Sequence, residues 1–156
     1  GPSGRGYGFS VGVDVNTDVL VFVEVEVDKN TGVTQVKRAV CCQDMGMVVN
    51  PQGAILQAEG SMLMGLGYAL REEIEFKGRE MLSRNFDTYS ITQFNMAPEM
   101  EVILVGTDNE IPYGGGEPPI VVMGGAVANA VFDATGARIL RQPLSPERVK
   151  AALDSI

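Results

Sequence analysis

One carboxylate follows directly on a run of three glycines, because residues 113–119 read Tyr-Gly-Gly-Gly-Glu-Pro-Pro and the glutamate is Glu117. Glycine can adopt positive φ and lets the backbone approach a ligand closely. The two prolines suit the first turn of a helix, where a missing N–H costs little. We therefore expect a helix over 120–132 that ends near Thr135–Gly136, where glycine suits a C-cap. The pattern predicts a glutamate on a glycine loop at the N-terminal end of a helix.

Glu117 could act as a general base. Burial raises the pKa of a carboxyl group and a helix N-terminus lowers it, and a base needs a pKa near the working pH. The apolar residues of the helix behind it are not confined to one stripe, so we expect that helix to be buried on most sides. The alternative is a structural role, in which Glu117 caps the helix and the glycines only turn the chain. The spacing alone leaves both open, because Gly-Gly-Gly-Glu is a weak pattern.

A second helix is predicted over about 51–71, with Asn50 as its N-cap and a proline in its first turn. It contains three glycines, Gly60, Gly65 and Gly67. Each costs ~1 kcal/mol relative to alanine inside a helix, which indicates close packing against a neighbouring helix or a flat cofactor. Gln57 lies in the same helix, and its amide can both donate and accept hydrogen bonds. It is a candidate ligand-binding residue or, alternatively, a surface glutamine.

The remaining elements position these two helices. Alternating apolar residues predict three strands, over 7–15, 19–28 and 33–42, joined by short turns as an antiparallel meander. The glycines at 4–8 precede a strand rather than a helix, so we interpret them as the beginning of a strand and not as a phosphate loop. Further expected elements are a small hairpin around 74–82, a strand over 101–105 covered on both faces from Val102, a short strand over 138–140 and a last helix beginning at Ser145–Pro146. The predicted fold class is α+β, an antiparallel or mixed sheet packed against two or three helices in one domain, residues 1–156.

The composition excludes several functions. The chain has 156 residues, a net charge of −8 and a pI of about 4.5, so nucleic acid and anionic membranes are poor partners. No uncharged run reaches the ~18–20 apolar residues of a membrane span. Histidine is absent, and the two cysteines, Cys41 and Cys42, are too few for an iron–sulfur cluster and too close in sequence for a mutual disulfide. No metal ligands are therefore assigned in this chain.

Several segments in combination resemble the end of the molybdenum-binding subunit of the xanthine oxidase family, in its branch of bacterial aldehyde oxidoreductases, isoquinoline oxidoreductases and nicotinate dehydrogenases. These segments are Gly114–Pro119, Ala126–Gly136, Asn50–Pro51, Gln57–Gly60 and Gly65–Gly67. The family loop usually reads Gly-Val-Gly-Glu, and Gly115 is a mild departure from it.

The resemblance implies the fold of the second molybdopterin-binding domain of molybdenum hydroxylases. It implies that Glu117 is the base in a hydroxylation of an aldehyde or N-heterocycle, with water as the oxygen source. Gln57, Gly115 and Gly116 would contact the cofactor, a molybdopterin in its cytosine dinucleotide form. The implied partners are the rest of the molybdenum-binding subunit, an iron–sulfur subunit or domain, with or without a flavin subunit, and a small-molecule substrate. The bacterial cytoplasm is the expected location, with the periplasm as the alternative.

The same resemblance predicts that these 156 residues alone are inactive and hold no molybdenum. Two other interpretations stay open. A non-catalytic scaffold domain, with the glycine loop packed on a partner chain, predicts an exposed apolar patch and no cleft beside Glu117. A stand-alone binder of a small ligand predicts a closed pocket formed by this chain.

Overall fold

The computed structural model describes residues 3–106, 108 and 110–156. Its helices are α1 (Pro51–Leu70), α2 (Pro118–Thr135) and α3 (Pro146–Leu153), with a 3-10 helix, η1, at Phe94–Met96. Its strands are β1 (Arg5–Asp14), β2 (Thr17–Val27), β3 (Thr34–Asp44), β4 (Phe76–Lys77), β5 (Glu80–Met81) and β6 (Glu99–Val105). The α+β class is confirmed.

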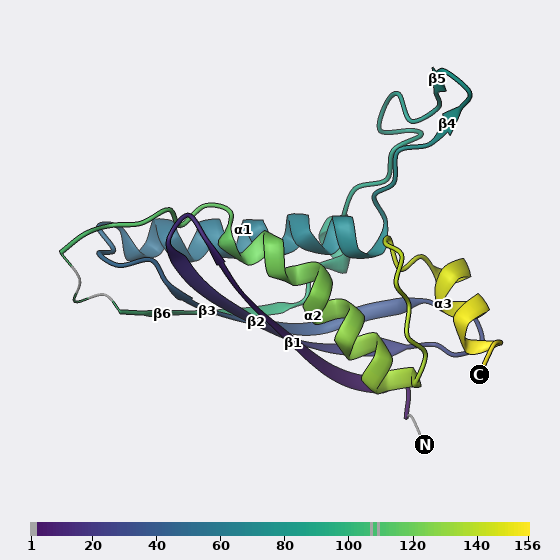
Figure 1. Ribbon diagram of the computed structural model, residues 1–156, viewed down its shortest axis with the longest axis horizontal. Coiled ribbons are helices and arrows are strands. Elements are labelled where there is room, and N and C mark those ends of the chain that lie inside the picture. The colour runs from purple at the N-terminus through teal and green to yellow at the C-terminus, as the bar shows by residue number, and fades with distance from the viewer. Residues whose placement is uncertain (1–2, 107, 109) are drawn as a thin grey trace.

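The main sheet has the strand order β1-β2-β3-β6. The first three strands form the expected antiparallel meander, and β6 adds parallel to β3, so the sheet is mixed. Helices α1 and α2 lie together over one face of this sheet, and the β4–β5 hairpin projects away from it (Figure 1). This arrangement brings the beginning of α2, and the glycine loop before it, next to α1.

The core lies between the sheet and the two long helices. The inward face of β2 consists of the alternating valines found in the sequence, none of them more than 4% exposed: Val19, Val21, Val23, Val25 and Val27. They belong to the same buried cluster as Val127 and Val131 of α2 and Met62 of α1. The period-2 pattern therefore predicted the buried face of β2 correctly.

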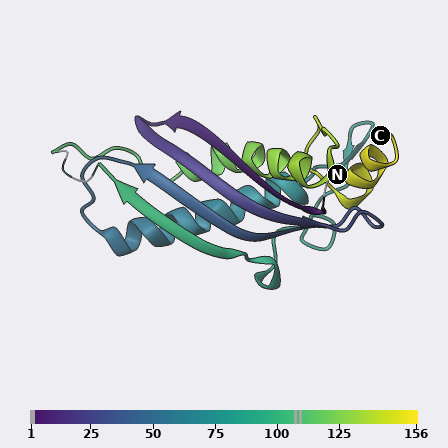
Figure 2. The same cartoon turned by 90° about the horizontal axis from the view of Figure 1, so that it is seen from below.

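Strand β1 turns its small residues inward. A Cβ on Gly6 or Gly8 would lie 2.3 Å from backbone atoms of α2, so only glycine lets the helix approach this closely. The large side chains of β1 point the other way, and Phe9, Val11 and Val13 are 59%, 63% and 69% exposed. Figure 2 shows this second face of the sheet, which none of the described helices covers. Gly6 and Gly8 thus lie within a strand, as expected, and their packing against α2 is a further role that the sequence did not indicate.

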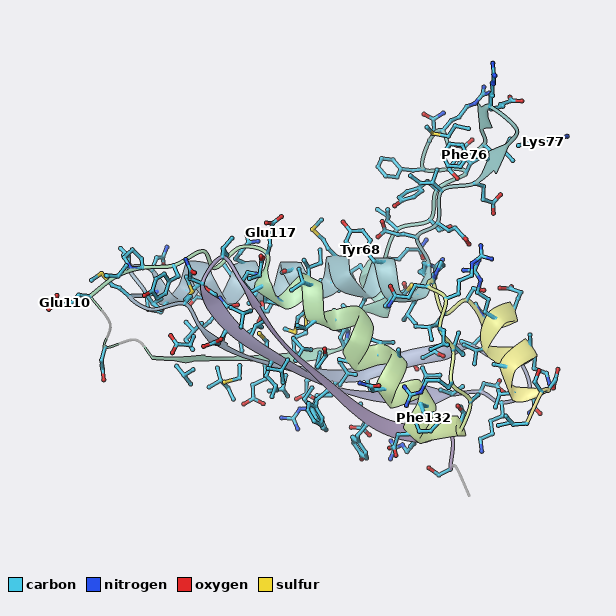
Figure 3. All side chains as sticks on the ribbon, in the orientation of Figure 1. Tyr68, Phe76, Lys77, Glu110, Glu117 and Phe132 are labelled. Atoms are coloured by element: carbon cyan, nitrogen blue, oxygen red, sulfur yellow. The ribbon has the colours of Figure 1, made fainter. Side chains whose placement is uncertain are left out.

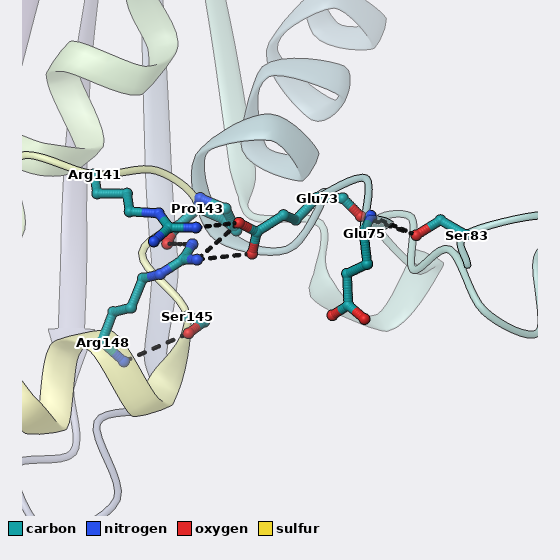
Figure 4. Close-up of polar contacts among 7 residues, drawn as sticks. All are labelled: Glu73, Glu75, Ser83, Arg141, Pro143, Ser145 and Arg148. Atoms are coloured by element: carbon teal, nitrogen blue, oxygen red, sulfur yellow. Dashed lines mark hydrogen bonds and ion pairs between the residues drawn. The ribbon is translucent and has the colours of Figure 1, made fainter. Parts of the chain in front are cut away.

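An ion-pair cluster joins the segment after α1 to the C-terminal part of the chain. Glu73 accepts hydrogen bonds from Arg148 at 2.8 Å and from Arg141 at 2.9 Å (Figure 4). The hydrogen bonds from Arg148 and then from Arg141 lower the pKa of the Glu73 carboxyl group. Nearby, the N–H of Leu144 donates to the carbonyl oxygen of Ala69 at 2.7 Å. The end of α1 is therefore tied to the beginning of α3.

Two local expectations were wrong. Strand β6 is covered on one face only, because Ile103 and Val105 are 43% and 40% exposed. At β6 the sequence showed apolar residues, and the number of covering layers determined how many of them became buried. Residues 138–140 form no strand. Helix α2 is buried on most sides, as expected, and leaves only part of its surface to solvent, where Val121 and Phe132 are 57% and 40% exposed.

Candidate active site

Gln57 and the glycine loop meet in the structure. Helix α1 begins where predicted, because the Asn50 side chain caps it by accepting from the N–H of Gly53 at 3.0 Å. Gln57 lies in the second turn of this helix and donates from Nε2 to the carbonyl oxygen of Gly116 at 3.0 Å. The two candidates are 59 residues apart in sequence. The fold has brought the predicted cofactor-binding glutamine to the residue that precedes the predicted base.

Glu117 occupies the N-cap position of α2, but its side chain makes no capping hydrogen bond. It is exposed and points away from the sheet on the side of α1 (Figure 3). The expected shelter around this carboxylate is thus not provided by the part of the chain that the structure describes. Capping does not explain the choice of glutamate either, because the α2 backbone receives nothing from its carboxylate.

The three loop glycines do not owe their place to positive φ, contrary to expectation. A Cβ on Gly114 would lie 2.4 Å from Cγ2 of Val15, a stiff β-branched side chain, so this position needs glycine for packing. A Cβ on Gly115 would meet the mobile end of Met45. At Gly116 the nearest atom to such a Cβ is Nε2 of Gln57, at 4.0 Å. A Cβ on Gly116 would therefore face open space apart from this one contact.

Two further side chains reach the loop, and the sequence analysis missed both. Thr17, at the beginning of β2, donates from Oγ1 to the carbonyl oxygen of Gly114 at 2.7 Å. Gln43, near the end of β3, donates from Nε2 to the carbonyl oxygen of Gly115 at 3.4 Å. Both side chains are fully buried. The available signal was a polar residue at an inward-facing strand position. Thr17 lies on the same face of β2 as Val19, and Gln43 lies on the same face of β3 as Cys41.

The glycines of α1 serve two purposes. A Cβ on Gly65 would lie 2.5 Å from Met123 of α2, which confirms close helix packing at this position. A Cβ on Gly60 would meet nothing within 4 Å. Gly60 is three residues from Gln57 and so lies on the same side of the helix. The surface beside Gln57 is consequently free of side chains at both Gly60 and Gly116.

A cavity of about 680 Å³ lies farther along α1, lined by residues that include Leu63, Tyr68 and Phe94. Phe94 is 98% exposed, so this is an open apolar groove rather than a closed pocket. Its lining contains neither Gln57 nor Glu117. Across the described residues there is no group of three or more His, Cys, Asp or Glu side chains that could hold a metal ion. Nor does that part of the chain contain a helix with the length and apolarity needed to cross a bilayer.

The fold defines the class of protein. The chain superposes on the crystal structure of the aldehyde oxidoreductase from Desulfovibrio desulfuricans with a TM-score of 0.80 and 29% sequence identity, over 87% of this chain and 15% of that one. The architecture is thus that of a cofactor-binding domain of the molybdenum hydroxylases. The chain belongs to the molybdopterin cofactor-binding domain family, whose sequence profile matches residues 9–98. The matched residues include Gln57 and end before the glycine loop.

Relatives in bacteria agree with this assignment. The chain is 38% identical to a nicotinate dehydrogenase subunit of Pseudomonas putida, over 81% of this chain and 11% of that protein. It is 32% identical to the aldehyde oxidoreductase molybdenum-binding subunit of Escherichia coli, over 83% of this chain and 19% of that subunit. The chain therefore spans less than a fifth of the length of these two relatives.

The residues around Gln57 fit a pterin-type cofactor. Within the described part of the chain, Gln57 uses one amide N–H for Gly116, which leaves its second N–H and its oxygen for the polar edge of a ring. The open surface at Gly60 and Gly116 gives a flat group room to approach.

Proposed function

We propose that this chain provides the general base, Glu117, and a cofactor contact, Gln57, to a molybdopterin-dependent enzyme that hydroxylates an aldehyde or an N-heterocycle. The observation that supports the proposal most directly is the hydrogen bond from Gln57 to the carbonyl oxygen of Gly116. It fixes the residue before the base against the helix that would touch the cofactor. Gly115 and Gly116 complete this side of the cofactor site, Gly116 through the space that it leaves open.

When bound, the molybdenum cofactor supplies a two-electron oxidation in which water provides the oxygen and an iron–sulfur partner takes the electrons. Glu117 would accept the proton released from that water, and the hydrogen of the substrate C–H bond would leave with its electron pair to the cofactor as the C–O bond forms. A carboxylate free of capping bonds can take up a proton without breaking a contact of its own helix. Gln57 would orient the cofactor and, through Gly116, keep the base next to it.

The catalytic unit would be a larger protein, of which residues 1–156 form one C-terminal domain. The rest of the molybdenum-binding subunit would supply most contacts to the cofactor, in its cytosine dinucleotide form. It would also shelter Glu117 and cover exposed apolar side chains such as Phe9 and Val11. An iron–sulfur subunit, with or without a flavin subunit, would accept the electrons in the bacterial cytoplasm.

The substitution Glu117→Gln in the full-length protein, purified with its cofactor, tests the proposal. We expect turnover to fall by about 10²- to 10⁴-fold, the usual contribution of a general base, while molybdenum content stays unchanged. The control is Glu110→Gln, because Glu110 is also exposed and lies away from Glu117, farther back along the chain segment that leads to the glycine loop (Figure 3). Full activity of the Glu117→Gln variant would exclude the base role. Loss of its molybdenum would instead assign Glu117 to cofactor binding or structure.

The uncovered apolar face of the sheet favours a second candidate, a scaffold domain that packs against a partner chain. That function needs the apolar face but not the carboxylate of Glu117. The Glu117→Gln variant separates the two candidates. If the chain is only a scaffold, this variant should still assemble with its partner chain and keep full turnover.

A further inference from the structure

We propose that Thr17 and Gln43 are positioning residues, which hold the glycine loop by its carbonyl oxygens and so fix where Glu117 stands. The inference rests on the proposed role of Glu117 as the base. Neither residue touches the carboxylate. Thr17 acts through the backbone of Gly114, and Gln43 acts through that of Gly115.

Three consecutive carbonyl oxygens of the loop are each taken by a side-chain donor from a different element. Thr17 of β2 binds the first at 2.7 Å, Gln43 of β3 the second at 3.4 Å, and Gln57 of α1 the third at 3.0 Å. A run of three glycines has more conformational freedom than any other tripeptide, so without such contacts it would sample many conformations. With all three oxygens held toward the protein body, the loop has one defined path into α2.

Stability alone does not explain the choice of glutamine at position 43. Gln43 is fully buried, and its Oε1 has no hydrogen-bond partner among the described atoms. An unpaired buried amide oxygen is unfavourable, and a methionine would fill a similar volume without it. What the amide provides is its N–H group, which lies 3.4 Å from the Gly115 oxygen and 3.2 Å from the sulfur of Met45. The donor function is therefore the reason we assign to this residue.

A turn that contacts the glycine loop has a strained backbone conformation. Val15, in the turn between β1 and β2, has φ of 46°, in the left-handed region that β-branched residues rarely adopt. It accepts from the N–H of Gly114 at 3.4 Å and packs where a Cβ of Gly114 would be. Strain of this kind persists where surrounding structure enforces it, and it is common at functional sites. The turn thus supports the first glycine of the loop.

Proton transfer makes such support matter. A general base has to lie within hydrogen-bond reach, about 2.6–3.2 Å, of the atom whose proton it removes, so a small shift of the loop weakens catalysis more than binding. We therefore expect loss of a loop contact to lower kcat and leave KM and molybdenum content near their original values.

The test uses Thr17→Val and Gln43→Met in the full-length, cofactor-loaded protein. The control is Thr135→Val, because Thr135 is equally buried and its hydroxyl donates to the Val131 oxygen at 2.6 Å, at the far end of α2. Hydrogen–deuterium exchange of the peptide 111–117 reports on the loop, and kcat reports on the base. We expect faster exchange and a fall in kcat on the order of 10- to 100-fold for the two variants and no change for the control. Thr17→Ser, which keeps the donor, should restore both measurements and also shows that the site tolerates substitution.

Each other outcome decides against the proposal. Original exchange and kcat in both variants would show that the contacts do not hold the loop. Faster exchange with an unchanged kcat would make them merely structural, and equal losses in the Thr135→Val control would make the effect one of general stability. If Glu117→Gln is active, the function itself is rejected, whereas an inactive Glu117→Gln with normal Thr17→Val and Gln43→Met variants rejects only the positioning role.

Discussion

Gln57 of α1 donates a hydrogen bond to the carbonyl oxygen of Gly116, the residue before Glu117, over 3.0 Å. This contact joins the second turn of α1 to the loop that ends at Glu117, through one solvent-exposed hydrogen bond. If a cofactor touches Gln57, we expect it to influence the position of Glu117 as well. The candidate site is thus formed by the beginnings of two helices.

The loop glycines should respond differently to alanine. Gly116→Ala adds a Cβ with only Gln57 nearby, at 4.0 Å, so folding stability should change by no more than about 0.5 kcal/mol. If Gly116 borders the cofactor, this variant should lose molybdenum or show a raised KM. Gly114→Ala instead places a Cβ 2.4 Å from Val15 and should destabilise the protein by about 1–3 kcal/mol. Thermal unfolding and metal analysis of both variants measure these effects, and a fully loaded, fully active Gly116→Ala variant would show that nothing approaches this glycine.

The Glu73 cluster should make stability depend on pH. Its arginine partners lower the pKa of Glu73 below the usual 4.5, so the charged carboxylate stabilises the folded state above that value. This contribution is lost as the pH falls through the lowered pKa. At pH 7, Glu73→Gln should reduce the melting temperature by no more than a few degrees, because the pairs are partly exposed to solvent.

The difference in melting temperature between the Glu73→Gln variant and the unmodified protein should shrink as the pH is lowered from 5 toward 3, as measured by calorimetry. Glu75→Gln serves as the control, because its carboxylate points away from both arginines (Figure 4). A difference in melting temperature that stays constant with pH would mean that Glu73 stabilises the fold by packing rather than by its charge.

The chain of 156 residues by itself should bind no molybdenum. The described residues offer no cluster of metal ligands, and one glutamine with one glutamate gives too few contacts for useful affinity for a dinucleotide cofactor. Metal analysis by mass spectrometry of the isolated chain, expressed in a host that makes the cofactor, measures this. Stoichiometric molybdenum would show that the chain forms a complete cofactor site.

The sequence predicted the elements whose signals are local. The valine alternation of β2 gave its buried face, Asn50 and the following proline gave the beginning of α1, and Gly136 ends α2 in the expected left-handed conformation. The motifs also indicated the family, which the comparisons confirm. Glu117 and Gln57 were candidates on residue type and resemblance, and their roles remain predictions.

Only the tertiary structure showed how the loop is held. Thr17 and Gln43 lie 97 and 72 residues from the glycines that they bind. The alternating pattern of a strand indicates which side chains point inward but not which distant residue they contact. Likewise, the apolar residues of β1 and β6 gave no hint of which face would stay uncovered. Local propensity follows from neighbouring residues, whereas a partner or a covering layer exists only once the chain has brought distant segments into contact.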